Sequence, residues 1–192
     1  MTSVYFVRHA QPDKTVHDDR TRPLTAEGLR DSIAVADLLQ GCNIDLLMSS
    51  PYKRSMDTIG VLSKRLGMEI HTDENFRERN AGGWHGDNFL EFIKKQWTDF
   101  DYRIMNGENL REVQARNVST LKKLLSENED KNIVLATHGT ALSTILNYYY
   151  PEYDYSCFMK IIDFMPFVIR VDFENGSAVK AQVELVIHKM YK

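Results

Sequence analysis

Two short apolar runs, each stopping at a histidine, place the strongest constraint on the fold of this chain. Residues 4–7 (Val-Tyr-Phe-Val) are followed by Arg8 and His9, and residues 133–137 (Ile-Val-Leu-Ala-Thr) are followed by His138. Such runs, rich in β-branched residues, are typical of strands that are buried on both faces of a sheet. Ligands of open α/β sheets bind at the carboxyl ends of the strands. We therefore expect both imidazoles at one edge of one sheet.

Helical patterns lie between the predicted strands. Thr25 is a candidate N-cap for a helix that ends at Gly41, and Pro51 suits the first position of a second helix, which ends at Gly67. The first helix has its apolar residues at helical spacing (Leu29, Ile33, Ala36 and Leu39). The other elements expected are strands at 45–49 and 69–71, helices at 87–97 and 141–149, a helix capped by Asn109, and a terminal hairpin of residues 167–173 and 178–187 joined by Asn175-Gly176.

This order of elements predicts an α/β fold. Three strand-then-helix units imply a three-layer α/β/α sandwich with a mostly parallel central sheet, and the terminal hairpin adds antiparallel strands at its edge. The chain has 192 residues, and we expect residues 1–192 to form a single domain.

Composition argues against several kinds of partner and location. The formal net charge of -3 gives no reason to expect nucleic-acid binding. No apolar run approaches the roughly 18 residues of a membrane-spanning helix, and the N-terminal run is too short for a signal peptide. The two cysteines, Cys42 and Cys157, form no CxxC pattern. We therefore expect a cytoplasmic protein that associates with neither nucleic acid nor membranes.

The pair Arg8-His9 is informative because of the arginine. A histidine at the end of a buried strand is more often a core residue than a functional one, so His9 alone indicates little. Burying a guanidinium without an anion is costly, which makes Arg8 a candidate ligand of a carboxylate or a phosphate. Its planar fork fits both groups, so an internal Asp or Glu is the alternative partner.

Two further segments repeat this arrangement. Gly139 follows His138 and precedes a predicted helix, whose N-terminal N–H groups attract anions. Arg54 lies in the first turn predicted after residues 49–51 (Ser-Ser-Pro). Taken singly, each of these features is weak evidence, and Gly139 could be only a turn residue. Together, two imidazoles and two guanidiniums at one sheet edge predict a site for a phosphoryl group, with His9 as the nucleophile.

A departing alkoxide needs a proton source, and Glu78 is our candidate. It lies between Phe76 and Trp84 in a glycine-bearing loop, where partial desolvation would raise its pKa and keep it protonated. The alternative is a surface Glu78 paired with Arg77 or Arg79.

Histidines also serve as metal ligands, so a metal site has to be considered. No HxxxH or HxxEH pair and no cysteine cluster accompanies the six histidines, which are His9, His17, His71, His85, His138 and His188. We therefore expect no metal and no other cofactor.

These segments, in this order, resemble the histidine phosphatase superfamily, also called phosphoglycerate mutase-like, and in particular its small cytosolic phosphatase branch. The matching segments are residues 7–11 for the opening Arg-His-Gly motif, 23–28 for the leader of the first helix, 49–58 for the Ser-Ser-Pro, Arg and Thr segment, 77–86 for the acid-donor loop and 136–139 for the closing His-Gly.

The resemblance implies a phosphohistidine mechanism. His9 would attack phosphorus in line, and Glu78 would protonate the leaving group and then help water to attack the intermediate. The phosphoryl oxygens would be neutralised by Arg8, Arg54 and His138, and the expected substrate-binding set also includes Gly139, Gln11 and Thr15.

The chain departs from the family pattern at four positions. Ala10 replaces the usual Gly, which is tolerable if the backbone there needs no positive φ. Gln11 stands where mutase members commonly have Glu, and Thr15 where many members place a phosphate-contacting Asn. His85 replaces a frequent acid.

The leading interpretation is a phosphatase acting on a small phosphorylated metabolite. A phosphoglycerate mutase is the main alternative, but the segment 86–109 is short for the long lid insertion of mutase members. A phosphoprotein phosphatase remains open. A non-catalytic phospho-ligand binding protein is disfavoured by the presence of both His9 and Glu78. The terminal hairpin could pair in a homodimer, and the sequence does not choose between dimer and monomer.

Overall fold

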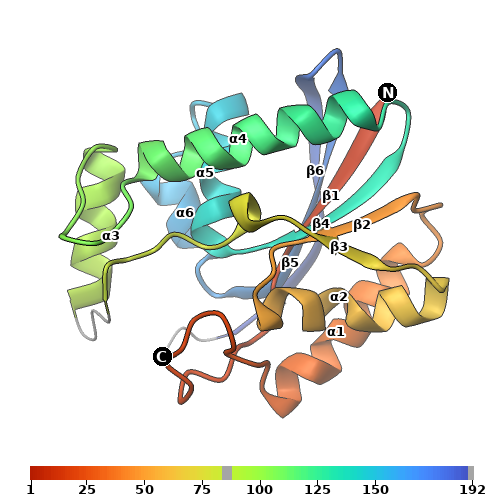
Figure 1. The fold of residues 1–192 in the computed structure, drawn as a ribbon, viewed down its shortest axis with the longest axis horizontal. Helices are drawn as coiled ribbons and strands as arrows, with labels where there is room; N and C mark the ends of the chain where they lie inside the picture. Colours follow the sequence, from red (N-terminus) through yellow and green to blue (C-terminus); the bar gives the residue numbers. More distant parts are fainter. Residues whose placement is uncertain (84–87, 190–192) are drawn as a thin grey trace.

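A six-stranded sheet forms the centre of the molecule (Figure 1). The computed structural model describes residues 1–83 and 88–189. The strands are β1 (Thr2–Arg8), β2 (Leu46–Ser49), β3 (Ile70–Thr72), β4 (Asn132–Thr137), β5 (Phe164–Glu174) and β6 (Ser177–His188), arranged in the order β3-β2-β4-β1-β5-β6. The first four strands of this order are parallel, β5 is antiparallel to β1, and β6 is antiparallel to β5. The predicted mostly parallel sheet with an antiparallel hairpin at its edge is confirmed.

Helices cover both faces of this sheet (Figure 1). They are α1 (Ala26–Leu39), α2 (Lys53–Leu66), α3 (Phe89–Thr98), α4 (Leu110–Glu127), α5 (Gly139–Tyr149) and α6 (Tyr155–Ile161), and the 3-10 turn η1 (Glu74–Phe76) precedes the loop that carries Glu78. Helices α1 and α2 pack on one face and α4 and α5 on the other, whereas α3 packs with α6 at one end. The predicted three-layer arrangement is therefore also confirmed.

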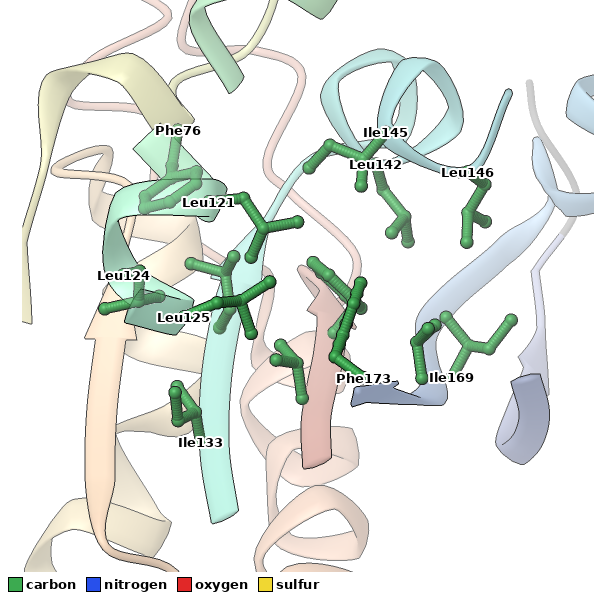
Figure 2. Close-up of a cluster of buried hydrophobic side chains, with 14 of the residues drawn as sticks. Phe76, Leu121, Leu124, Leu125, Ile133, Leu142, Ile145, Leu146, Ile169 and Phe173 are labelled. Carbon is green, nitrogen blue, oxygen red and sulfur yellow. The ribbon is translucent and has the colours of Figure 1, made fainter. Parts of the chain in front are cut away.

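The two strands that end in the histidines are buried on both faces, as their composition predicts. In β1, Val4 and Phe6 pack towards α4 and α5, while Tyr5 and Val7 pack towards α1 and α2. The residues of β4 alternate in the same way. Figure 2 shows the α4 and α5 side, where Leu121, Leu124, Leu125, Leu142, Ile145 and Leu146 close over the strands. Burying each such side chain stabilises the fold by about 1.5–3 kcal/mol.

Several predicted helix and turn signals are confirmed. Thr25 caps α1 by accepting from the Gly28 N–H, and Asn109 and Glu112 form a capping box at the start of α4. Gly67 ends α2 in the left-handed region, with φ of 65°. The hairpin turn has positive φ at both of its central residues, Asn175 and Gly176, as its sequence requires.

The predicted apolar face of α1 is partly wrong. Leu29 and Ile33 are 50% and 43% exposed, and the buried line of the helix runs instead through Gly28, Ser32, Val35, Ala36 and Leu39. The cause is the close approach of Gly28 to the loop after β1, because a Cβ atom at this position would lie 2.4 Å from the Gln11 carbonyl oxygen. That contact fixes which face of α1 turns inwards.

Two other expectations also need correction. Pro51 lies before α2 rather than at its first position, since the helix begins at Lys53 after an extended Tyr52. The short helix α6 was not predicted; it is capped by the Asp154 carboxylate, which accepts from the N–H groups of Ser156 and Cys157. No helix within the described ranges is long and apolar enough to cross a membrane.

Candidate active site

The parallel pairing of β1 with β4 brings the two histidines together. Arg8 is in register with Thr137, and the His9 N–H donates to the Thr137 carbonyl at 3.1 Å. The ring centroids of His9 and His138 are 5.3 Å apart, with an angle of 59° between the ring planes. Both imidazoles therefore lie at one edge of the sheet, where the sequence places them.

The His9 ring is oriented by its own neighbour. Nδ1 lies 2.8 Å from the Ala10 carbonyl oxygen, and because a carbonyl only accepts, Nδ1 carries the proton and the neutral ring keeps a lone pair on Nε2. Burial, and then the charges of Arg54 and Arg8, hold the pKa of His9 well below its ordinary value. Ala10 has no positive φ, and its N–H donates to Thr58 Oγ1 at 2.9 Å, so alanine is accommodated here.

Arg54 reaches the same region from the first turn of α2. Its guanidinium is almost completely buried and forms an ion pair with Asp19, with 3.1 Å between Nη2 and Oδ1. A second cation, Arg22, binds the same carboxylate oxygen at 3.0 Å. The loop between β1 and α1 thus holds Arg54 against the imidazoles and leaves the shared carboxylate 41% exposed.

Arg8 is held by backbone carbonyl groups of the C-terminal part of the chain. Its Nη1 donates to the carbonyl oxygens of Ile161 and Phe164, at the end of α6 and the start of β5. The guanidinium packs against Gly139, where a Cβ atom would lie only 3.2–3.3 Å from it. Arg8 and Arg54 both lower the pKa of each imidazole, so the two guanidiniums lie close enough to act on both rings.

His138 is fully buried at the N-terminus of α5. Its Nε2 lies 2.8 Å from Ser50 Oγ, and its ring packs edge-on against Tyr52, with centroids 5.1 Å apart. Burial, followed by Arg54, holds the pKa of His138 well below its ordinary value. Nδ1 of this ring is buried and has no hydrogen-bond partner among residues 1–83 and 88–189, which makes it a candidate contact for a ligand oxygen.

The Glu78 carboxylate binds the N-terminus of α5. It accepts from the N–H groups of Thr140 and Ala141, each at 3.1 Å, and from the Arg79 N–H at 2.8 Å. These three N–H groups orient the carboxylate at the start of α5. Arg77, the alternative surface partner, pairs with Glu108 instead at 2.7 Å. Trp84, which was expected to help desolvate Glu78, and His85 lie outside the described residues.

Arg8, Arg54 and the two imidazoles thus lie together at one sheet edge, and comparison with known proteins identifies the family. The sequence model of the histidine phosphatase superfamily (branch 1) matches residues 4–179. The chain belongs to this superfamily. The predicted family is therefore confirmed.

Relatives within the superfamily carry both phosphatase and mutase names. The chain is 28% identical over 150 residues to the uncharacterized phosphatase PhoE of Bacillus subtilis (strain 168), covering 76% of each protein. It is 26% identical over 159 residues to the probable phosphoglycerate mutase GpmB of Proteus mirabilis (strain HI4320), covering 77% of this chain and 74% of that protein. Membership and phosphatase relatives support the predicted enzyme class, a phosphoric monoester hydrolase.

A solved structure shares the fold of this chain. Phosphoserine phosphatase from Entamoeba histolytica superposes with a TM-score of 0.80 at 23% identity, covering 99% of this chain and 100% of that one.

Two predicted substrate-binding residues of this histidine phosphatase, Gln11 and Thr15, form hydrogen bonds to other residues of the chain. The side-chain oxygen of Gln11 accepts from the Thr25 hydroxyl at 3.0 Å, at the start of α1. Thr15 is exposed, and its hydroxyl donates to the Asp13 carboxylate at 2.7 Å. The structure therefore brings Arg8, His9, Arg54, His138, Gly139 and Glu78 around one sheet edge, and gives Gln11 and Thr15 hydrogen-bond partners in the adjoining loop.

Sequence reasoning assigned no individual role to Asp19 and Arg22. Both come from the charged loop of residues 13–22. The number of charged residues in a loop that follows a strand end is the sequence feature that could have indicated their position near the site. Arg22 adds a further cation near the site, since its charge contributes to lowering the pKa of His9 and of Arg54. Nowhere in the described part of the chain do three or more His, Cys, Asp or Glu side chains gather in a way that could hold a metal ion.

Proposed function

We propose that this histidine phosphatase hydrolyses a small phosphomonoester through a phosphohistidine intermediate on His9. The observation that carries the proposal is the His9 tautomer, because Nδ1 is committed to the Ala10 carbonyl and Nε2 is left as a neutral nucleophile. The depressed pKa of His9 keeps that nitrogen unprotonated at neutral pH.

The proposed reaction has two displacements at phosphorus. In the first, Nε2 of His9 forms an N–P bond while the ester P–O bond breaks, and a protonated Glu78 gives its proton to the departing alkoxide. In the second, Glu78 takes a proton from water, the water oxygen bonds to phosphorus, and the N–P bond breaks to release phosphate. Arg8, Arg54 and His138 would stabilise the charge on the phosphoryl oxygens in both steps.

The structural neighbours support a small metabolite as substrate. The phosphoserine phosphatase of Entamoeba histolytica has been solved with phosphoserine and with 3-phosphoglyceric acid, and another neighbour is a mycobacterial glucosyl-3-phosphoglycerate phosphatase. These ligands are phosphate esters of small hydroxylated carboxylic acids or their derivatives. We propose the same broad class for this chain.

Phosphoglycerate mutase activity is the second candidate, favoured by the relatives named GpmB. A mutase must return the phosphoryl group from His9 to the substrate and keep water away from the intermediate. Between residue 88 and the start of α4, the chain forms α3 and an irregular segment of residues 99–109, and this short stretch favours hydrolysis over a mutase with a long lid.

A quenched-flow experiment tests the intermediate. With a radiolabelled phosphomonoester, the wild-type enzyme should form an acid-labile, base-stable phosphoprotein and release phosphate, whereas His9→Ala should do neither. His71→Ala is the matched control, because His71 is an exposed histidine on β3. Near-normal turnover by His9→Ala would overturn the proposal.

A second assay separates phosphatase from mutase. With 3-phosphoglycerate, we expect phosphate release that does not depend on a bisphosphoglycerate primer. Primer-dependent isomerisation faster than phosphate release would instead establish the mutase. A panel of phosphorylated metabolites would then rank substrates by kcat/KM.

A further inference from the structure

Arg116 of α4 contacts the backbone of the segment that carries Glu78. Its guanidinium donates to the carbonyl oxygens of Asn75 at 2.6 Å, Arg77 at 2.9 Å and Glu78 itself at 3.2 Å. Outside helices and strands, a loop backbone has few fixed partners of its own. One side chain from α4 therefore fixes the path of the chain on both sides of residue 77.

Glu108 fixes Arg116 in turn. Its two carboxylate oxygens accept from Nε and Nη2 of Arg116 at 2.9 and 3.1 Å, a bidentate pair. Glu108 also accepts from the Arg77 side chain at 2.7 Å and from the Asn80 N–H at 2.9 Å. Burial alone would raise the pKa of Glu108, but the hydrogen bonds from Arg116 and Asn80 bring it below its ordinary value. Glu108 therefore stays ionised. It binds Arg77 and Asn80, which lie on either side of Glu78 in the sequence.

These contacts use the whole donor capacity of Arg116. An arginine side chain has five N–H groups, and the five hydrogen bonds to Asn75, Arg77, Glu78 and the two oxygens of Glu108 account for all of them. The pair is also largely enclosed, with side-chain exposures of 11% for Arg116 and 16% for Glu108. Arg116 therefore has no donor left for a substrate oxygen. It can act on the reaction through the segment it holds and through its charge, which also lowers the pKa of His138.

The same segment also contacts β4 and α5. The Glu78 carboxylate accepts from the N–H groups of Thr140 and Ala141, and the Thr137 hydroxyl donates to the Phe76 carbonyl at 2.9 Å. The backbone around Glu78 is thus tied to α4, while its carboxylate is tied to the helix that follows His138.

We propose that Arg116, paired with Glu108, is the positioning residue of the proton donor. It holds the backbone of residues 75–78 so that the Glu78 carboxylate lies beside the phosphoryl site, where it can reach the leaving oxygen. The inference rests on the proposed function, in which Glu78 protonates the leaving group.

The leaving group distinguishes a positioning role from a merely structural one. A general acid matters for an alkoxide, which leaves poorly without a proton, and matters little for p-nitrophenolate, which leaves as the anion. The comparison uses kcat/KM, which reports the first displacement, because hydrolysis of the intermediate is common to both esters and also uses Glu78. Arg116→Met should therefore lower kcat/KM for glycerol 2-phosphate by about 10- to 100-fold, the effect of misplacing a catalytic group by about 1 Å. Its kcat/KM for p-nitrophenyl phosphate should change little. Arg116→Lys keeps the charge but loses the planar guanidinium fork. Its kcat/KM for glycerol 2-phosphate should lie between the values of the wild type and of Arg116→Met.

Arg111→Met is the matched control. Arg111 lies on the same helix and also pairs with a carboxylate, that of Asp101 at 2.7 Å, but both side chains are exposed. This variant should leave both esters unaffected. If Arg116→Met lowers kcat/KM equally for the two esters, Arg116 is a structural residue and the proposal is overturned.

A double variant tests whether Arg116 acts through Glu78. In the Glu78→Gln background, Arg116→Met should cause no further loss with glycerol 2-phosphate, because the donor is already gone. The same fold-loss in both backgrounds would show that Arg116 acts independently of Glu78 and would contradict the proposal.

Amide hydrogen exchange provides a readout that does not depend on activity. Arg116→Met should accelerate exchange at Thr140 and Ala141, whose N–H groups bind the Glu78 carboxylate, and Arg111→Met should not. Unchanged exchange in Arg116→Met would overturn the positioning role. Wild-type protein that hydrolyses no ester at all would instead overturn the proposed function, so the two failures are distinguishable.

Discussion

Gly139 lies so close to the Arg8 guanidinium that a Cβ atom on residue 139 would be 3.2 Å from Nε and 3.3 Å from Cζ of Arg8. Arg8 cannot withdraw freely, because its Nη1 is bound to the carbonyl oxygens of Ile161 and Phe164. The missing side chain at residue 139 therefore sets how closely the guanidinium approaches the N-terminus of α5.

Gly139→Ala should separate activity from stability. The added methyl group displaces the Arg8 guanidinium by a few tenths of an ångström, and we expect kcat/KM for p-nitrophenyl phosphate to fall by about tenfold. Alanine is favoured over glycine in helices by up to about 1 kcal/mol, so thermal stability should be unchanged or raised. Enzyme assays and thermal unfolding of the same preparation check both parts. A variant with wild-type kcat/KM would show that the fit of Gly139 to Arg8 is unimportant.

Arg54→Ala should remove a main source of charge stabilisation in the transition state. We expect a loss of about 2–4 kcal/mol in kcat/KM, by comparison with removal of an oxyanion donor. Arg65→Ala is the control, since Arg65 lies in the last turn of the same helix and pairs with Asp37 in an exposed position. Steady-state kinetics of the two variants provide the comparison. Equal, small effects would exclude Arg54 from the site.

The buried imidazoles should make the protein less stable in mild acid. Burial and Arg54 hold the pKa values of His9 and His138 below the ordinary value, so the unfolded chain takes up protons near pH 6.5 that the folded protein does not bind. The free energy of unfolding is therefore fully present above about pH 6.5 and decreases as the pH falls towards the folded pKa values. Denaturant titrations across this range in phosphate-free buffer should show the decrease. His138→Gln should reduce the slope, and an unchanged slope would contradict the assignment.

A bound oxyanion should reverse part of this shift. A phosphate dianion among Arg8, Arg54 and the two rings favours the protonated imidazole, so inorganic phosphate should raise the pKa of both His9 and His138. Titration of the ring carbon-bound protons by NMR, with and without phosphate, measures the change. The exposed His188 serves as an internal reference and should titrate alike in both conditions. Phosphate that moves none of the resonances would exclude this edge as its binding site.

Two glycines test the packing of α1, because Gly28 lies against the backbone of Gln11 and Gly60 faces open space. Gly28→Ala should destabilise the fold by about 1–3 kcal/mol, because its Cβ atom would lie 2.4 Å from the Gln11 carbonyl oxygen. Gly60→Ala in α2 meets nothing within 4 Å and should be neutral or stabilising by up to about 1 kcal/mol. Chemical denaturation of both variants gives the comparison. If the two had equal stability, the contact with Gln11 would not determine the orientation of α1.

Local sequence signals predicted the parts of this fold that depend on neighbouring residues. The strands ending at His9 and His138, the caps at Thr25 and Asn109, and the Asn175-Gly176 turn each follow from residues within a few positions of one another. Strand pairing then places both histidines at one edge because parallel strands present their carboxyl ends together.

The parts that could not be predicted depend on contacts between distant residues. The buried face of α1 is set by Gln11, and Glu78 meets the N–H groups of α5 more than sixty residues away. The sequence suggested an apolar surrounding for Glu78, whereas the structure gives its carboxylate three N–H donors. The ion pair of Arg116 with Glu108 had no local signature at all.

The position of β1 has a consequence for the synthesis of this protein. Strand β1 lies between β4 and β5, so neither of its neighbours exists until residues beyond 131 and 163 have been made. During synthesis this apolar strand therefore lacks both of its partners for most of the given sequence, and unpaired strands of this kind favour misfolding and aggregation.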